Sequence, residues 1–486
     1  MIFSSFSFLI FFIIVLGLVI CLPQKVRKLV LLIASYYFYA YWDVRFTLLI
    51  FASTVIDYTL GHLLVHFSTP RQRKVCLALS VIANLGFLGF FKYYNFFIDS
   101  ADVILSSWGI GTSNLDIILP VGISFYTFQT MSYTIDIYRN RLKPTKDFWD
   151  FALFVSFFPQ LVAGPIVRAS EFLPQLDKPV KITKANLWAG SQIFIVGLFK
   201  KLMIADAVAP LVDQVYAYPE YFSSLTVWLA IIAYSIQIYA DFSGYSDMAI
   251  GCARILGFRF NQNFNMPYLS KNISEFWRRW HISLSGWLRD YLYISLGGNR
   301  RGSIRTYVNL MITMILGGLW HGASWNFVLW GFLHGLALCL HRLWSNQSQT
   351  MNMDGTHIDT LDDAIGTSRN GVFDAVQRVL SVLCTASFVS VVWVFFRSTS
   401  LSTTITIFKK LLLIDSTGVT WVYIYVPIAV AICLGAHIVG SLRNSDELVF
   451  FDHPNSYRAA FATALTLILI YVFAPNNVSP FIYFQF

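Results

Sequence analysis

The stretch 317–335 reads GGLWHGASWNFVLWGFLHG, and it combines the features that decide the fold and the function. Tryptophan, leucine and glycine dominate it, as in a membrane helix, yet it contains His321 and His334. A histidine in an apolar helix is more often a satisfied core residue than a functional one. Ionisable side chains in a membrane are nevertheless costly and usually face a polar interior or each other. Small neighbours such as Gly322 also let another molecule approach closely, so His321 is a candidate site residue.

The composition of the whole chain is typical of a membrane protein. Of its 486 residues, 56% are hydrophobic and only 13% are charged, whereas soluble domains carry about 25% charged residues. Apolar runs of roughly 17–25 residues, the length that a bilayer core requires, recur from 6–22 to 458–474. The first run lacks a basic segment before it and a signal-peptidase site, so we expect a retained span.

These runs predict an all-α polytopic membrane protein with about 11–13 transmembrane helices. We expect re-entrant or interfacial helices besides them and one membrane-embedded domain over 1–486. Pro159, Gly164 and Pro165 interrupt 149–175, which we expect to be re-entrant because a broken helix in a membrane must be packed inside protein. The insert 344–376 is polar and is predicted to be a surface loop.

Lysine and arginine are distributed unevenly among the short loops. The loops after the first, third and fifth spans hold Lys25, Arg27, Lys28, Arg71, Arg73, Lys74, Arg139, Arg141, Lys143 and Lys146. The loops between them, 43–45 and 98–116, hold only Arg45. Because basic loops stay in the cytoplasm, the N-terminus and the loop 98–116 are predicted to be outside.

The segment 253–305 carries most of the chain's positive charge. It has nine lysines and arginines against Glu275 and Asp290, and the whole chain has a net charge of +9. One interpretation is a cytoplasmic, partly amphipathic segment anchored to anionic lipid. The other is a binding site for a phosphate-bearing cofactor, with Arg278, Arg279, Arg300 and Arg301 as ligands. Nucleic acid is not expected as a partner, since a membrane bundle offers it no docking face.

A second polar stretch, YADFSGYSDMAIG at 239–251, places Asp241, Ser243 and Asp247 around a glycine. It predicts an interrupted helix that lines a polar cavity together with Trp320. The alternative is that the aspartates cap helices or form hydrogen bonds between helices.

No metal site is predicted from the sequence. His62 and His66 have the spacing of a metal pair but no third ligand, and the six cysteines are scattered without a CxxC motif.

Taken together, the motifs resemble the membrane-bound O-acyltransferase (MBOAT) family. FWRRWHISLSGWLRDYLYISLGGNRRG and NLMITMILGGLWHGASWNFVLWGFLHG carry the resemblance, with YADFSGYSDMAIG before them and FFPQLVAGPI earlier. The bacterial polysaccharide O-acetyltransferase branch is the most similar, above all the membrane subunit of alginate O-acetylation. Peptidoglycan and cellulose O-acetylation and, more distantly, D-alanyl transfer to teichoic acid remain alternatives.

The resemblance implies a set of functional expectations. His321 matches the family's active-site histidine, and His281 in RRWHISLS matches a second histidine of this branch. The helices would form a funnel through the membrane. Acetyl-CoA would be the donor substrate, with no tightly bound cofactor. The acetyl group would cross the bacterial inner membrane to a periplasmic acetyltransferase or SGNH-type partner within a polysaccharide secretion complex.

Acyl transfer also fits the residues themselves. A hydroxyl acceptor needs a base, and histidine titrates closest to neutral pH. The developing oxyanion needs donors, for which backbone N–H groups near Gly317, Gly318 and Gly322, the side chain of Asn326 or an indole could serve. A transporter would show an internal repeat, which is not visible, and a scaffold with a structural histidine is the third alternative.

Overall fold

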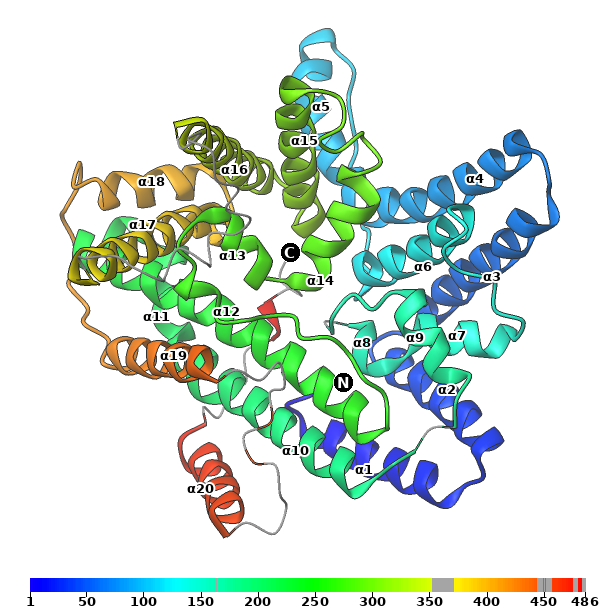
Figure 1. The fold of residues 1–486 in the computed structure, drawn as a ribbon. Helices are drawn as coiled ribbons and strands as arrows, with labels where there is room; N and C mark the ends of the chain where they lie inside the picture. Colours follow the sequence, from blue (N-terminus) through cyan, green and yellow to red (C-terminus); the bar gives the residue numbers. More distant parts are fainter. Residues whose placement is uncertain are drawn as a thin grey trace. The chain divides into compact units, whose positions relative to one another are not determined.

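The fold is helical throughout the part of the chain that the structure describes. This computed structural model describes residues 1–162, 164–179, 181–351, 371–443, 449, 451, 457–474 and 480–482. Within these ranges the only exception to helices and irregular segments is an isolated β-bridge between Phe222 and Val419 (Figure 1). The all-α prediction is therefore confirmed.

The chain forms two compact units, each described here by itself. Unit 1 comprises Met1–Ala209, Gln237–Asn263 and Ser445–Phe486, and unit 2 comprises Pro210–Ile236 and Phe264–Asn444. The helices α11 (Asp206–Ala217) and α12 (Ser224–Ile255) contribute to both. The prediction of a single functional domain over 1–486 remains a prediction.

The remaining helices fall wholly into one unit or the other. Unit 1 contains α1 (Phe6–Cys21), α2 (Gln24–Ala40), α3 (Arg45–His66), α4 (Pro70–Leu88), η1 (Gly89–Tyr93), α5 (Tyr94–Leu105), η2 (Ser106–Trp108), α6 (Ile123–Tyr138), α7 (Phe148–Ser156), α8 (Phe158–Leu161), α9 (Ala169–Leu176), α10 (Lys184–Phe199), η3 (Lys200–Ala205) and α20 (Tyr457–Phe473). Unit 2 contains η4 (Pro219–Tyr221), η5 (Pro267–Leu269), α13 (Ile273–Arg279), α14 (Ile282–Trp287), η6 (Leu288–Tyr293), α15 (Ser303–His321), α16 (Trp325–Met351), α17 (Gly371–Arg397), α18 (Leu401–Leu411) and α19 (Tyr425–Leu442).

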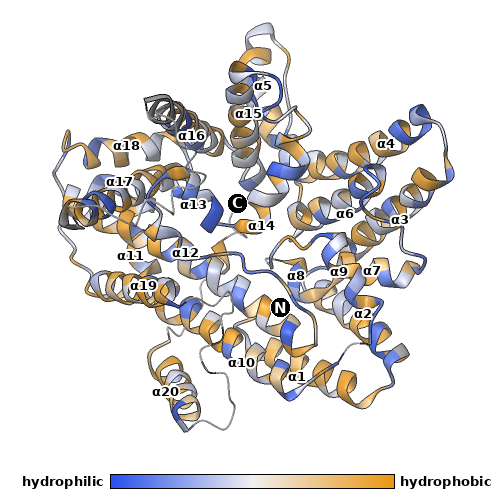
Figure 2. Cartoon of the chain, viewed as in Figure 1, coloured by the Kyte–Doolittle hydropathy of each residue, from blue (hydrophilic) through white to orange (hydrophobic). Residues whose placement is uncertain are grey.

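Several helices have the length and hydropathy of membrane spans. Among the described residues, six qualify: Arg45–His66, Pro70–Asp102, Ser224–Ile255, Trp325–Ser345, Phe373–Arg397 and Tyr425–Leu442. Two shorter helices, α1 and α20, are also apolar, and both are mostly orange in Figure 2. The chain is thus a multi-pass membrane protein, while the expected number of about 11–13 spans stays a prediction.

The expected break in 149–175 is present. The chain forms α7, α8 and α9 in place of one long helix, with Pro159 in the first turn of α8. Proline lacks the N–H that a helix interior requires but is tolerated in the first turn. The break is therefore dictated locally, and its re-entrant character remains a prediction.

The expected interruption of 239–251 is wrong, because α12 runs unbroken from Ser224 to Ile255. Gly244 does not end the helix. A Cβ at this position would lie 2.7 Å from the carbonyl oxygen of Gly197 in α10. The glycine thus allows two helices of unit 1 to pack closely, and close packing of small residues is a common reason for glycine in membrane helices.

Glycines also set the packing of α15 against α16 in unit 2. A Cβ on Gly318 would lie 2.2 Å from the carbonyl oxygen of Phe327, and a Cβ on Gly331 would lie 2.3 Å from that of Met314. A Cβ on Gly322 would collide with the ring of Phe327 at 2.0 Å. These glycines therefore serve helix packing, which differs from the substrate approach that the sequence suggested for Gly322.

The two ends of the insert 344–376 are helical, because α16 reaches Met351 and α17 begins at Gly371. The middle of the insert, 352–370, lies outside the described residues. The flanking helices thus extend further into the insert than expected. The surface loop stays a prediction for the middle of the insert.

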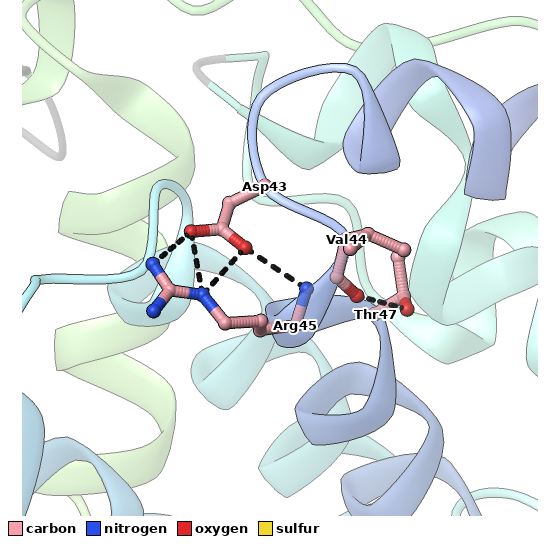
Figure 3. A network of polar contacts seen from close by, with 4 residues as sticks. All are labelled: Asp43, Val44, Arg45 and Thr47. Atoms are coloured by element: carbon pink, nitrogen blue, oxygen red, sulfur yellow. Dashed lines mark hydrogen bonds and ion pairs between the residues drawn. The ribbon is translucent and has the colours of Figure 1, made fainter.

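The short loop before α3 is electrically balanced. Asp43 accepts hydrogen bonds from the backbone N–H and the guanidinium of Arg45, and the shortest contact is 2.6 Å (Figure 3). Thr47 bonds back to the carbonyl of Val44 at the start of the helix. The loop thus carries a single basic residue, held by Asp43, which is fewer than in each basic loop used to orient the chain.

Candidate active site

His321 is the last residue of α15 and is enclosed by aromatic rings. Its side chain is buried, with 3% of its surface exposed. The ring centroids of Trp320, Trp330 and Phe396 lie 5.1, 5.2 and 5.2 Å from that of His321, all in edge-on arrangements. These rings come from α15, α16 and α17, so three helices of unit 2 together fix the imidazole.

His281 lies next to His321 in the same unit. The two imidazole centroids are 6.4 Å apart, and Trp320 lies 6.1 Å from His281. The structure therefore brings together the two histidines that the sequence singled out, with Trp320 beside both. They come from segments separated by 40 positions in the chain, and the approach depends on packing of α13 against α16 and of η6, which follows α14, against α15.

The backbone at His281 has an uncommon conformation. Its φ and ψ are 44° and 55°, in the left-handed region, and it directly precedes the first turn of α14. Non-glycine residues with positive φ are uncommon and concentrate at functional sites, where the surroundings hold them. Here Trp280 and Leu284 are both buried on either side, so packing holds His281 in the turn between α13 and α14.

His281 is an uncharged group at neutral pH. It is completely buried and lies outside the six candidate spans. Burial lowers the pKa of His281 to about 3, because desolvation disfavours the charged imidazolium. Its Nδ1 lies 3.5 Å from the hydroxyl oxygen of Ser283. A neutral imidazole in this position offers one hydrogen-bond donor and one acceptor.

The four candidate arginines of the basic segment differ in their surroundings. Arg278, Arg300 and Arg301 are exposed, while Arg279 is half-buried. Arg279 forms an ion pair with Glu275 at 2.8 Å and bonds to the carbonyl of Asn265, so it already stabilises the segment. Arg278 has a weaker contact, at 3.2 Å, with Ser274.

Arg300 and Arg301 stand in a glycine-rich turn before α15. Three glycines of this GGNRRG turn have positive φ, at Gly297, Gly298 and Gly302. The amide of Asn309 in α15 donates a 3.1 Å hydrogen bond to the carbonyl of Gly298 and ties the turn to the helix. The turn therefore presents two exposed guanidinium groups on a fixed backbone.

Asn326 does not lie open beside His321. Its side-chain amide donates to the carbonyl of Ser398 at 2.9 Å, and its oxygen accepts from the hydroxyl of Thr404 at 3.3 Å. Both ends of the buried amide are thus used to connect α16 with the end of α17 and with α18. This engagement favours a structural role over the expected roles in binding the acetyl-CoA or the oxyanion.

Asp241, Ser243 and Asp247 belong to unit 1, whereas Trp320 and both histidines belong to unit 2. Asp241 and Asp206 accept from the ammonium of Lys201 at 2.7 and 2.9 Å. Asp247 pairs with Lys200 at 2.6 Å. These aspartates thus form buried ion pairs with η3, which agrees with the structural alternative stated for them.

Apart from Trp320, the aromatic neighbours of His321 were not singled out from the sequence. Trp330, Trp393 and Phe396 pack together beside it, with Trp330 and Trp393 stacked at 5.7 Å. His334 lies one turn after Trp330 on α16, with ring centroids 4.6 Å apart. The i, i+4 spacing of Trp330 and His334 was a usable signal, but nothing in the sequence indicated that α17 would complete the cluster.

These observations define a class of protein: an all-helical, multi-pass membrane protein whose second unit holds a buried pair of histidines among aromatic rings. The model of the MBOAT, membrane-bound O-acyltransferase, family matches residues 36–360. The chain belongs to this family, and it is accordingly an O-acyltransferase.

The chain is similar to several bacterial relatives. It is 47% identical over 346 residues to "Probable alginate O-acetylase AlgI" of Azotobacter vinelandii, covering 70% of this chain and 69% of the relative. It is 38% identical over 409 residues to the peptidoglycan O-acetyltransferase of Helicobacter pylori, covering 79% and 73%. A teichoic acid D-alanyltransferase of Streptococcus thermophilus is 26% identical over 56% of this chain and 69% of its own length.

Proposed function

We propose that this protein transfers an acetyl group from acetyl-CoA to a hydroxyl group, as a step in the O-acetylation of an extracellular or periplasmic polysaccharide. The observation that carries the proposal is the buried pair His321 and His281 in a chain of the O-acyltransferase family. The names of the alginate and peptidoglycan relatives support acetyl as the acyl group and a polysaccharide as the final acceptor.

His321 acts as the general base in this proposal. A ring nitrogen of His321 takes the proton of the acceptor hydroxyl, while the hydroxyl oxygen attacks the thioester carbonyl carbon. The tetrahedral intermediate then collapses, the carbon–sulfur bond breaks, and the thiolate takes the proton back from the imidazolium. The surrounding rings keep water away, and this limits hydrolysis of the thioester.

His281 has a different role, as a neutral hydrogen-bonding group that positions the donor or the acceptor. Burial keeps this imidazole uncharged, so it supplies a hydrogen-bond donor close to His321 without competing for the transferred proton. Its fixed turn between α13 and α14 supports positioning rather than proton transfer.

Arg278, Arg300 and Arg301 are the proposed ligands of the donor's phosphates on the cytoplasmic side. Their exposure supports this role, and guanidinium groups bind phosphate oxygens in a bidentate manner. Changing all three to alanine is expected to weaken acetyl-CoA binding, more so at low salt, where charges act over a longer distance. If the variant inserted poorly into the membrane, but the inserted protein bound acetyl-CoA with unchanged affinity, the result would instead favour lipid anchoring.

The setting of the reaction is proposed from the relatives. We place the protein in the bacterial inner membrane, where it would pass the acetyl group to a periplasmic acetyltransferase or SGNH-type partner of a polysaccharide secretion complex. Alginate is the proposed polymer, since the alginate relative shares 47% of its aligned residues with this chain. Peptidoglycan, cellulose and D-alanyl transfer to teichoic acid are the alternatives.

The direct experiment is acyl transfer by the purified protein with radiolabelled acetyl-CoA, compared across acceptors. Transfer to alginate oligosaccharides or to the periplasmic partner supports the proposal. Transfer only to peptidoglycan fragments, or only from a D-alanyl thioester, would replace the polymer or the acyl group. If free thiol were released no faster with the protein than without it, for every donor and acceptor, a transporter or scaffold would be favoured.

A further inference from the structure

His334 has a polar side chain without a hydrogen-bond partner among the described residues. It lies on α16 and is completely buried. Neither ring nitrogen has a hydrogen-bond partner among the residues that the structure describes. An imidazole always has at least one N–H donor, and in its neutral form the second nitrogen is an acceptor. A buried polar group left without a partner destabilises the folded protein.

Three tryptophans next to His334 show the same feature. The buried indole N–H groups of Trp277, Trp330 and Trp393 have no acceptor within the described part of the chain. Their rings lie 5.2, 4.6 and 6.4 Å from the ring of His334, measured between centroids. Four neighbouring side chains from α13, α16 and α17 thus present polar atoms with nothing to bond to.

Two further aromatic rings beside His334 are apolar. Phe276 stacks on its ring at 6.3 Å, and Phe388 meets it edge-on at 5.7 Å. Neither can serve as a hydrogen-bond partner, so the imidazole and the indoles need a small guest that both donates and accepts. Water fits this requirement, since a buried water typically makes about three hydrogen bonds to otherwise unsatisfied groups.

Trp330 connects this polar cluster with the candidate active site. Its ring lies 4.6 Å from that of His334 and 5.2 Å from that of His321, between centroids. The interplanar angle to His321 is 84°, so an edge contact fixes the orientation of that imidazole. Any group that holds the Trp330 ring in place therefore also holds one wall of the site.

We propose that His334, Trp277 and Trp330 form a buried water site, and that His334 is a positioning residue for His321 acting through Trp330. The effect on turnover rests on the proposed function, whereas the water site itself does not. His334 does not touch substrate in this account. Its contribution is to keep the base oriented.

Two variants of matched size separate a positioning role from simple packing. His334→Gln keeps a donor and an acceptor, while His334→Phe keeps an aromatic ring and removes both. We expect His334→Phe to lower kcat about 10–100-fold, since small misplacements of reacting groups cost up to that much, with KM for acetyl-CoA within about twofold. His334→Gln should stay near wild type.

His437→Phe provides a control for the loss of a buried histidine in the same unit. His437 is also fully buried, but its Nδ1 has a partner, the carbonyl of Cys433 at 2.8 Å. Activity per folded molecule should be unchanged in this variant. Three results would each overturn the positioning role. They are an equal loss of kcat in His334→Gln and His334→Phe, full activity in His334→Phe, and a raised KM with unchanged kcat in His334→Phe.

The water site is tested independently by cryo-electron microscopy of the wild-type protein at a resolution that shows ordered waters elsewhere in unit 2. We expect density at hydrogen-bond distance from a ring nitrogen of His334 and from an indole N–H. Its absence there would overturn the site. If the wild-type protein transferred no acyl group, the proposed function would fail, while this density would still decide whether the water site exists.

Discussion

Replacing Lys201 with methionine should destabilise unit 1 strongly. The ammonium of Lys201 lies between the carboxylates of Asp206 and Asp241, at 2.9 and 2.7 Å, and 2–4% of each of these side chains is exposed. Methionine has a similar length but no charge. The change would leave two carboxylates in an apolar interior, of which Asp241 would keep a 2.7 Å hydrogen bond from the backbone N–H of Ile482.

The expected magnitude follows from this burial. Removing one partner of a buried ion pair costs about 3–5 kcal/mol, because the remaining charge is uncompensated. Removing the charge of Asp241 as well leaves one uncompensated carboxylate, that of Asp206, in place of two, and this costs less. The double variant Lys201→Met with Asp241→Asn should therefore be more stable than Lys201→Met alone.

Denaturant titration of the detergent-solubilised protein measures this difference. Lys28→Met is a suitable control, because Lys28 also forms a 2.7 Å ion pair, with Asp150, but 29% of its side chain is exposed. A partly exposed pair of this kind contributes about 0–1 kcal/mol. If Lys201→Met cost no more than Lys28→Met, or if the double variant were less stable than the single one, the reasoning would be refuted.

Three further predictions concern packing, pH dependence and topology. Gly318→Ala should lower the unfolding free energy by about 1–3 kcal/mol, because the added Cβ would lie 2.2 Å from a carbonyl oxygen of α16. The control Gly86→Ala meets open space and should be neutral or stabilising in the same titration. Equal effects of the two substitutions on the unfolding free energy would contradict this prediction. Burial lowers the pKa of His281 from 6.5 to about 3, so the contribution of this residue to stability is complete above pH 6.5 and is lost as the pH falls towards 3. The variant His281→Gln should therefore lose less stability over this pH range than the wild type. The same dependence of stability on pH in both proteins would contradict this prediction. In a variant lacking the native cysteines, Ser107→Cys should react with an impermeant reagent from outside and Ser303→Cys only from inside, and the reverse pattern would invert the topology.

The helical fold and the choice of histidines could be predicted from local sequence. Long apolar runs have no other stable solution in a bilayer than helices. His321 stood out because it interrupts an apolar motif, and His281 was selected by the resemblance of its motif to the MBOAT family. Pro159 likewise marked a break that the structure contains. Each of these predictions depended on residues close together in the chain.

The errors concern contacts between distant segments. Gly244 suggested a helix break, but its partner across the helix contact is Gly197, 47 positions away. Asp241 and Asp247 suggested a polar cavity, which stays a prediction, but the sequence pattern did not indicate that Lys200 and Lys201 pair with them. Such pairings depend on tertiary packing, which a pattern along one helix does not specify.

The measurement that tests the central claim most directly is acetyl transfer per folded molecule in His321→Ala. If His321 is the base, the variant should insert and fold while turnover falls about 10²–10⁴-fold. His437→Ala, which removes another buried histidine of unit 2, is the matched control and should keep its specific activity. If His321 were only a packed core residue, its loss would cost about 1–3 kcal/mol of stability and reduce the amount of protein. Near-normal specific activity in His321→Ala would contradict the account.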